Sequence, residues 1–448
     1  MSSNTPLLDS IILSCKSKNN LEDAKTFLII ASKNCSDLEQ LDHIAYLQSE
    51  IKDYKGCVES LKLCLSMAYN DQSKFAIRAN AAKMYNHLNE PMMSLAYSKM
   101  NKEYQFDYDT LMEMSFSYYL MGNYAESEKM MRSLVADQNL PDEVRGRVEY
   151  NLGSYDIERG DFKKGLMGFI DVGHKIKIWH NRYTPNIPIW SGEGVSGKTV
   201  IIHAEGGIGD ELINVRFVNN LKKIGATPIW VSNNSELVRI FNRNEIQSTQ
   251  SLKDIDISNT VQCMAMYLPI LLDLDKDQLW YGAYLKPSDK YLDKWRKILP
   301  EGKKIALRWS GALVYDQNLH RSLTLKHYMD LFGSTPDITF VSVQRDCDLE
   351  QLKDYPNVLD LSDKLETLED LLACISLVDH TFSSCTSTVH VAGSLGANVT
   401  VFPPIAAYYT WLGRTDNKSD WYGNSVTVIR QQKLKDYSHL QSILPLTL

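Results

Sequence analysis

The stretch His203-Ala204-Glu205-Gly206-Gly207-Ile208-Gly209-Asp210-Glu211 decides the fold of the second part of this chain. The apolar run Thr199 to Ile202 precedes it and predicts a buried strand. Apolar residues then recur every three positions from Leu212 to Ile224, which predicts a helix that ends at Gly225. Pro228 to Val231 predict the next strand. Strand, glycine-rich turn, helix and strand in this order indicate a parallel α/β sheet.

The glycine-rich turn is the best candidate for a site in this part of the chain. Gly206, Gly207 and Gly209 allow backbone N–H groups at a helix start to approach a ligand closely. Asp210 adds a carboxylate at the edge of the turn. A plainer interpretation is that Asp210 caps the helix, because aspartate is common there and a cap alone stabilises by about 1 kcal/mol.

Composition indicates an ordinary globular protein. A chain of 448 residues with 44% hydrophobic content is long enough for two or three domains, each with its own core. The net charge of -7 offers no general basic field, so nucleic acid is not the default partner. The amino terminus lacks a basic signal region. The longest apolar run, Cys263 to Leu272, is too short to span a bilayer and contains Pro269. We therefore expect a cytoplasmic protein without a membrane span.

Cysteine usage indicates reduced thiols. The chain has eight cysteines and no Cys-x-x-Cys pair, which argues against a disulfide framework and against a zinc site. Cys57 and Cys64 lie two helical turns apart, and burial in a helical core explains them better than metal binding does.

The first third of the chain is repetitive. Four similar segments begin at Asp53, Glu90, Asn123 and Asp161, and their second residues, at 54, 91, 124 and 162, are 37, 33 and 38 residues apart. These spacings are close to the tetratricopeptide period, which predicts stacked helical hairpins with a concave surface. Two interpretations stay open. The repeats are scaffold or capping structure for the rest of the chain, or their groove holds a protein partner or guides a large acceptor.

The pattern changes after the repeats. Trp179 to Lys198 loses helical periodicity and is rich in turn-forming residues. Beyond it strands and helices alternate, which predicts parallel sheets covered by helices, and a restart near Lys304 predicts two of them. Further strands are expected at Ile255–Ile257, Lys304–Trp309, Ile338–Val343, Leu377–Phe382 and Val399–Phe402. Further helices are expected at Met264–Leu272, Asp289–Leu299, Ser322–Leu331, Thr367–Ile375 and Thr386–Leu395.

An ordered set of motifs carries a family resemblance. They are Trp190-Ser191-Gly192, the stretch from Gly197 to Asp210, Arg308-Trp309-Ser310-Gly311, His320-Arg321-Ser322, Phe340 to Gln344, His390 to Gly396 and Trp421-Tyr422. The set resembles bacterial and phage tetratricopeptide-repeat glycosyltransferases. These are GT-B enzymes whose catalytic half is similar to heptosyltransferases and more distantly to the O-GlcNAc transferase.

The resemblance implies a domain organisation. Residues 1–178 would form the helical repeat domain and 179–198 a linker. Residues 199–302 would form a Rossmann-like domain that holds the acceptor, and residues 303–448 a second one that holds the nucleotide sugar. No obligatory metal and no cofactor beyond the nucleotide-sugar co-substrate are implied.

The resemblance also implies roles for the candidate residues. Asp210 is similar in position to the carboxylate of the heptosyltransferase Gly-Asp turn, and we interpret it as the base that activates the acceptor, with Glu211 and Glu205 as fallback carboxylates. Thr386 and Ser387 would meet the diphosphate at a helix start. His390 would lie near the ribose, and Gln344 would meet the base or the ribose. Arg321 and Arg308 would neutralise the charge of the diphosphate, and Ser310 would also bind the donor.

Plainer interpretations stand beside these roles. The hydroxyl-rich run Ser383 to Ser387 could be helix capping, and His390 could be a satisfied core histidine. The arginines could be surface cations and Gln344 a strand-end amide. The chain also departs from its relatives, because Cys385 occupies a position where heptosyltransferases usually carry aspartate.

Competing cofactor motifs do not hold. Gly207-x-Gly209-x-x-Leu212 lacks the third glycine of a dinucleotide fingerprint, and no acidic residue follows the strand that ends at Val231. The pairs Asp254-x-Asp256 and Asp273-x-Asp275 are common by chance, so we expect no metal site.

The sequence thus predicts a glycosyltransferase that moves a sugar from a nucleotide-sugar donor to an acceptor hydroxyl or similar nucleophile, inverting and without metal. The alternative is a non-catalytic repeat scaffold or adaptor with a degenerate transferase domain, which the Cys385 substitution favours. The sequence leaves open the donor sugar and base. It also leaves open whether the acceptor is a protein, a glycan, a lipid-linked saccharide or a modified nucleobase.

Overall fold

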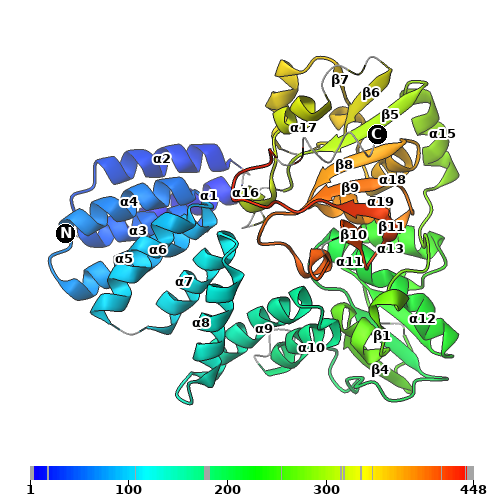
Figure 1. Cartoon of the computed structure of the whole chain (residues 1–448), viewed down its shortest axis with the longest axis horizontal. Helices are drawn as coiled ribbons and strands as arrows, with labels where there is room; N and C mark the ends of the chain where they lie inside the picture. The colour runs from blue at the N-terminus through cyan, green and yellow to red at the C-terminus, as the bar shows by residue number, and fades with distance from the viewer. Residues whose placement is uncertain are drawn as a thin grey trace. The chain divides into compact units, whose positions relative to one another are not determined.

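The computed structural model describes residues 5–17, 20–105, 107–175, 182–253, 255–312, 315, 318–332, 335, 337–345, 347–414, 416–438 and 440. The chain divides into two compact units. The first contains Met1–Val148 and Leu313–His320, and the second contains Glu149–Ala312 and Arg321–Leu448. Figure 1 labels most of the helices and strands. The first residues of the predicted linker, from Trp179 to Asn181, lie outside the described residues.

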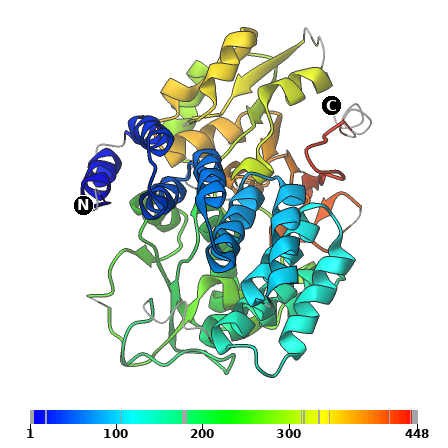
Figure 2. The ribbon, with the colours of Figure 1, turned by 90° about the vertical axis from the view of Figure 1, so that its left-hand side faces the viewer.

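The first unit consists of stacked helices, seen in blue and cyan in Figure 2. They are α1 (Thr5–Ser17), α2 (Leu21–Lys33), α3 (Leu38–Glu50), α4 (Tyr54–Met67), α5 (Asp71–His87), α6 (Pro91–Tyr104), α7 (Tyr108–Leu120) and α8 (Tyr124–Ala136). Each helix from α3 to α7 contacts the next in the chain. The predicted helical repeats are confirmed, and α4, α6 and α8 begin at the expected positions 54, 91 and 124.

The turns of the repeats follow from local chemistry. Asp53 and Asn123 accept a hydrogen bond from the backbone N–H three residues on and so cap α4 and α8. The residue before the cap of α8, Gly122, has a positive φ of 78°, which glycine adopts without strain. Inside the unit, Cys57 and Cys64 are buried in the apolar core, as expected.

One helical hairpin packs with the α/β part. Helix α10 (Phe162–Lys175) begins at the fourth expected repeat position, and α9 (Asp142–Glu158) precedes it. Phe162, Leu166 and Phe169 of α10 belong to the apolar cluster of the second unit. The repeats are predicted to end at residue 178, whereas the first compact unit ends at Val148. The two boundaries differ because this hairpin buries its apolar face in the α/β core.

The first sheet has four parallel strands in the order β3-β2-β1-β4. The strands are β1 (Thr199–His203), β2 (Thr227–Val231), β3 (Ser248–Thr249) and β4 (Thr260–Met264). The helix expected after the glycine turn is present as α11 (Ile208–Asn214), a 3-10 turn η1 (Val215–Phe217) and α12 (Val218–Lys223), and α13 (Ser235–Arg243) follows β2.

One expectation for this sheet is wrong. No strand forms at Ile255–Ile257, because Asp256 accepts a hydrogen bond from the Ser258 N–H in a turn and Ile257 is exposed. The strand is β4, which is buried along its whole length. The helix expected near Met264–Leu272 is present as η2 (Ala265–Tyr267) followed by α14 (Leu268–Leu271), and Met264 still belongs to β4.

The second sheet has the order β10-β11-β9-β8-β5-β6-β7 and is parallel except for β10. Its strands are β5 (Lys303–Arg308), β6 (Ile338–Ser342), β7 (Val358–Asp360), β8 (His380–Ser384), β9 (Val399–Phe402), β10 (Lys418–Ser419) and β11 (Gly423–Val428). Its helices include α15 (Asp289–Ile298), α17 (Leu325–Phe332), α18 (Leu368–Ser376) and α19 (Ser387–Ser394). The short helix α16 (Asn318–Arg321) contains the boundary between the two units, which lies between His320 and Arg321.

The strand order places a switch point in each sheet. In the first sheet the chain moves from β1 outward through β2 and β3, and then returns to the other side of β1 as β4. The second sheet repeats this pattern with β5, β6 and β7 on one side and β8 on the other. This is the order of Rossmann-like sheets. The predicted fold class, helical repeats followed by a GT-B pair of Rossmann-like domains, is confirmed.

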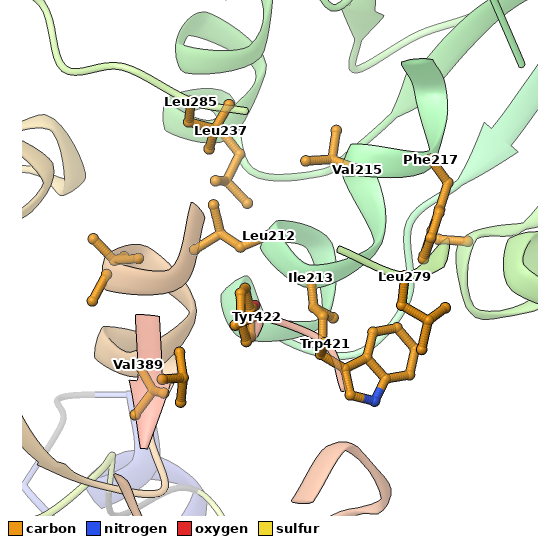
Figure 3. Packing of buried hydrophobic residues seen from close by; sticks show 14 of the residues in the cluster. Leu212, Ile213, Val215, Phe217, Leu237, Leu279, Leu285, Val389, Trp421 and Tyr422 are labelled. Carbon is orange, nitrogen blue, oxygen red and sulfur yellow. The ribbon is translucent and has the colours of Figure 1, made fainter. Parts of the chain in front are cut away.

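One apolar cluster joins the two sheets. Figure 3 shows Leu212 and Ile213 of α11 in the same cluster as Val389 of α19 and as Trp421 and Tyr422, which precede β11. Burial of such side chains from two sheets in a single core stabilises their mutual arrangement. The start of α11 and the start of α19 are therefore held together inside one compact unit.

A buried arginine strengthens this junction. The guanidinium of Arg216, in η1, donates to the backbone carbonyls of Leu279 and Trp421 and lies 4.4 Å from the centre of the Tyr422 ring. Only 1% of Arg216 is exposed. Because a desolvated cation gains from carbonyl dipoles and aromatic faces, these contacts replace its water shell.

Cysteine and membrane expectations can be compared with the described residues. All eight cysteines are free thiols, as expected. In the part of the chain that the structure describes, no helix is long and apolar enough to cross a bilayer.

The junction yields a prediction at Gly209. Alanine within a helix is normally worth up to about 1 kcal/mol more than glycine. A Cβ at Gly209, however, would lie 2.7 Å from Cδ2 of His390. We expect Gly209→Ala to lower the free energy of unfolding by about 1–3 kcal/mol, because the core must shift to accept the methyl group. Chemical denaturation measures this.

The matched control is Gly194→Ala, because a Cβ there meets nothing within 4 Å. It should leave the unfolding midpoint almost unchanged. A Gly209→Ala variant as stable as the wild type would show that α11 and α19 do not approach each other this closely.

Candidate active site

The two candidate motifs lie at the switch points of the two sheets. The segment Glu205 to Asp210 follows the carboxyl end of β1, and the segment Ser383 to Ser387 spans the carboxyl end of β8 and the start of α19. Helices α11 and α19 contact each other and are neighbours in Figure 1. Ligands of α/β sheets bind at the carboxyl ends of strands beside a switch point. The structure thus brings both motifs to the region where a ligand is expected.

The carboxylate of Asp210 has two donors. Its Oδ2 accepts the backbone N–H of Gly207 at 2.7 Å, which caps α11. Its Oδ1 accepts the hydroxyl of Tyr408 at 2.8 Å. Gly206 has a positive φ of 72°, and a Cβ there would collide with the Asp210 carboxylate. Capping therefore uses one oxygen of Asp210, and the other accepts a hydrogen bond from a side chain of the loop after β9.

Opposing effects act on the charge of Asp210. Burial raises the pKa of this carboxyl above its ordinary value, and the hydrogen bonds from Gly207 and Tyr408 work in the opposite direction. The guanidinium of Arg321 also favours the ionised form. The net pKa is raised, which is the direction expected for a carboxyl that exchanges protons near neutral pH.

Glu205 is a second buried carboxyl beside Asp210. Its Oε1 accepts the backbone N–H of Met266, just past β4, at 2.6 Å, whereas its Oε2 finds no partner among the described residues. Burial, together with the nearby charge of Asp210, raises the pKa of Glu205 to about 7. The switch point of the first sheet therefore carries two buried carboxyls: both oxygens of Asp210 accept a hydrogen bond, whereas only one oxygen of Glu205 does so among the described residues.

The third carboxylate of the loop, Glu211, is held internally. Its Oε2 accepts the indole N–H of Trp230 at 3.0 Å and its Oε1 accepts the hydroxyl of Ser232 at 2.9 Å. Glu211 therefore ties α11 to the end of β2. Its use as a base stays a prediction and would require one of these bonds to yield.

The Thr386 side chain at the start of α19 does not cap the helix. Thr386 is the N-cap residue, but its side chain makes no cap hydrogen bond and instead pairs with the hydroxyl of Ser383 at 3.1 Å. Ser387 is partly exposed. The interpretation of this run as plain capping therefore does not account for the Thr386 hydroxyl.

Cys385 links the helix start to two neighbours. Its Sγ accepts the indole N–H of Trp411 at 3.1 Å, and its backbone carbonyl accepts the Arg321 guanidinium at 3.0 Å. Burial raises the pKa of the thiol. At this position the chain therefore has a thiol with a raised pKa, and the backbone carbonyl of the same residue holds an arginine beside the start of α19.

His390 lies in the contact between α11 and α19. Its ring stacks on Trp411, with centroids 5.5 Å apart and an angle of 20°, and its Nδ1 pairs with the Tyr422 hydroxyl at 2.8 Å. Burial and the charge of Arg216 lower its pKa to about 3, so the ring is neutral. These contacts are those of a core histidine, and contact with a ribose stays a prediction.

Gln344 and Ser310 form a buried network at the ends of β5 and β6. The Gln344 side chain accepts the backbone N–H groups of Trp309 and Ser310 and donates to the Ser310 hydroxyl and the Cys347 carbonyl. Arg308 donates to the Val343 carbonyl at 3.1 Å. The amide of Gln344 is thus engaged by the protein, and a role in base or ribose binding stays a prediction.

The sequence does not predict two neighbours of the candidate residues. Tyr408 donates to Asp210, and Trp411 donates to Cys385. They lie in the aromatic run Tyr408-Tyr409-Thr410-Trp411 between β9 and β10. The density of aromatic residues was the available signal, but the run has no helical or strand periodicity that could place it.

Metal-ligating side chains do not cluster in the part of the chain that the structure describes. No group of three or more His, Cys, Asp or Glu side chains there could hold an ion. Asp254 of the first aspartate pair lies outside the described residues. Asp273 and Asp275 of the second pair bind Lys163 at 2.7 and 3.0 Å.

Comparisons with known proteins gave weak likenesses. No protein-family model matches the chain, and no curated protein does. A Thermobaculum terrenum O-GlcNAc transferase structure is 11% identical, with 99% of this chain and 92% of that chain covered and a TM-score of 0.37. The glycosyl transferase family 9 structure from Veillonella parvula is 10% identical, with 53% and 87% covered and a TM-score of 0.40.

A further structure, the E. coli ADP-heptose lps heptosyltransferase II, is 10% identical, with 56% of this chain and 97% of that chain covered and a TM-score of 0.37. The repeat part is similar to MamA from Desulfovibrio magneticus RS-1, at 16% identity, with 40% and 97% covered and a TM-score of 0.30. At values this low, the likenesses carry no argument about substrate or mechanism, which must come from the chain's own residues.

The raised pKa of Glu205 yields a prediction. Because its pKa rises from an ordinary 4.5 to about 7 in the folded state, ionisation destabilises the folded protein as pH rises between these values. Glu205→Gln cannot ionise. Its unfolding free energy relative to the wild type should therefore increase by up to about 3 kcal/mol from pH 4.5 to pH 7 and stay level below pH 4.5.

Denaturant unfolding at several pH values measures this difference. Glu301→Gln, at an exposed position, controls for the loss of one carboxyl charge. A difference between Glu205→Gln and wild type that does not change with pH would show that Glu205 is not desolvated.

Proposed function

We propose that the chain is a glycosyltransferase that moves a sugar from a nucleotide-sugar donor to an acceptor nucleophile. One observation carries the proposal. The aspartate of the glycine turn after β1 and the hydroxyl-rich start of α19 after β8 are held together in one unit. Arg321 donates to the Cys385 carbonyl at the start of α19, and its charge favours the ionised form of Asp210. This pairs a base with a diphosphate-binding end.

The reaction has a defined proton and bond balance. Asp210 takes the proton of the acceptor while the acceptor oxygen bonds to the anomeric carbon and the bond from that carbon to the diphosphate breaks. Attack from the face opposite the leaving group inverts the configuration. Burial and the charge of Asp210 raise the pKa of Glu205, which disfavours a second carboxylate charge beside the base.

The departing diphosphate needs positive charge and donors. Arg321 supplies a guanidinium, and Thr386 and Ser387 supply hydroxyls at the positive end of the α19 dipole. Because these protein groups can offset the developing charge, the proposed mechanism has no metal step. The acceptor would lie on the side of the first sheet, nearer to Asp210 and Glu205.

Binding of the donor is the first test. In a thermal shift screen with UDP, GDP, ADP and CMP and their sugar conjugates, one nucleotide should raise the melting temperature, since ligand at about 100 times its Kd adds about 2.7 kcal/mol to stability. A Thr386→Val, Ser387→Ala double variant should lose the shift. If no nucleotide shifts the wild type at millimolar concentration, a non-catalytic scaffold becomes the better description.

The base is tested by Asp210→Asn. An asparagine oxygen can still accept the Gly207 N–H, so the cap of α11 and nucleotide binding should persist. Release of nucleoside diphosphate from the donor selected in the screen should fall by about two orders of magnitude or more. Asp256→Asn, which changes another turn aspartate outside the site, is the matched control. Unchanged turnover would leave Asp210 with capping as its whole role.

A further inference from the structure

A hydrogen bond joins the proposed base to the loop that follows β9 of the second sheet. The hydroxyl of Tyr408 donates to Oδ1 of Asp210 at 2.8 Å, although the two residues are 198 positions apart. Asp210 follows a strand of the first sheet, whereas Tyr408 follows β9 of the second. Tyr408 and Asp210 are therefore carried by different elements of the fold.

The loop after β9 is anchored on both sides of Tyr408. At its start, the Gln431 N–H donates to the Pro403 carbonyl at 2.9 Å. Further along, Arg430 donates to the Trp411 carbonyl and pairs with Glu158 of α9 at 2.7 Å. The other oxygen of Glu158 accepts the Gly413 N–H at 3.0 Å. Because the loop is fixed before and after Tyr408, the hydroxyl is held in a defined position.

We propose that Tyr408 is a positioning residue for Asp210, fixing the orientation of its carboxylate and stabilising its ionised form. This inference rests on the proposed function, in which Asp210 is the base. With Oδ2 bound to the Gly207 N–H and Oδ1 bound to the Tyr408 hydroxyl, the carboxylate cannot rotate freely. Each oxygen can accept a second hydrogen bond, so one position on Oδ1 remains for the acceptor proton.

The direction of the hydrogen bond is settled by the phenol. Burial and the charge of Asp210 raise the pKa of Tyr408 well above its ordinary value, so the hydroxyl keeps its proton at neutral pH and can only donate to a carboxylate. A donor that meets an ionised carboxylate makes a stronger bond than one that meets a neutral carboxyl. Tyr408 therefore favours the form of Asp210 that can act as a base.

Other charged and titratable groups face Asp210 from the surrounding elements. Arg321 favours its ionised form. The charge of Asp210 in turn raises the pKa of four neighbours, which are Glu205 in the loop after β1, Glu211 in α11, Cys385 in the loop after β8 and Tyr409 in the loop after β9. Burial opposes ionisation. Two side chains lower the Asp210 pKa against the effect of burial, Tyr408 and Arg321. Among the described residues, only Tyr408 does so by a direct hydrogen bond.

The test compares Tyr408→Phe with Tyr409→Phe. Each variant removes one buried phenol oxygen and keeps the ring, and the two tyrosine rings are neighbours with centroids 4.6 Å apart. A transferase needs Asp210 ionised, and activity is lost as pH falls through its pKa. In Tyr408→Phe the acid limb of the kcat/KM profile should move up by about one pH unit and kcat should fall, whereas Tyr409→Phe should keep the wild-type profile.

A second measurement is independent of turnover. Aspartate labelled with 13C at the carboxyl carbon reports titration directly, and Asp210→Asn identifies the Asp210 resonance by its loss. The midpoint should move up in Tyr408→Phe and stay in place in Tyr409→Phe. Melting temperatures of both variants check that the fold is kept.

The outcomes separate the two proposals. If the Asp210 titration moves but the wild type transfers no sugar and binds no nucleotide, the positioning contact stands and the proposed function fails. If the wild type transfers sugar but Tyr408→Phe keeps its pH profile and titration, the positioning role is overturned. A rise in turnover in Tyr408→Phe would also overturn it, because the hydroxyl would then be blocking the acceptor.

Discussion

The close approach of α11 to α19 is the constraint on which the rest of this site depends. Gly209 has no side chain, and the ring of His390 fills the space that a Cβ would need. Trp411 stacks on that ring and the Tyr422 hydroxyl pairs with it. Because each helix begins at the switch point of its own sheet, this contact also fixes the separation of the glycine turn from the hydroxyl-rich helix start.

Around this contact, dipoles and aromatic rings of the described residues surround the buried charged groups. Arg216 is enclosed by carbonyl groups and aromatic rings, and its charge helps to keep His390 neutral. Asp210 is balanced by a backbone N–H, a phenol and a more distant guanidinium. Such arrangements cost desolvation free energy, which fixed dipoles offset only while the geometry is kept. The charged groups therefore depend on the apolar core that holds α11 and α19 together.

The sequence revealed what local patterns encode. Continuous apolar runs predicted β1, β5, β6 and β9, and the repeat spacing predicted the helix starts at 54, 91, 124 and 162. Ile255–Ile257 shows the limit, because a half-buried and an exposed isoleucine imitate a strand and the buried strand begins at Thr260. Tyr408 could not be predicted at all, since its contact with Asp210 spans 198 positions and no periodic pattern surrounds it. Long-range polar contacts depend on tertiary geometry, which a single sequence does not display.

The candidate polar residues divide by how fully the protein satisfies them. Gln344 and Glu211 have their side-chain oxygens engaged by donors within the fold, and such groups stabilise the structure because a buried polar atom without a partner is costly. Glu205 is the opposite case. One of its oxygens is buried without a partner among the described residues, beside a second carboxyl, at the switch point where α/β sheets bind ligands. Stability alone does not account for that cost. A buried carboxyl pair at this position suits the proton transfer that we propose, in which Asp210 gains the proton of the acceptor beside a carboxyl whose pKa is raised.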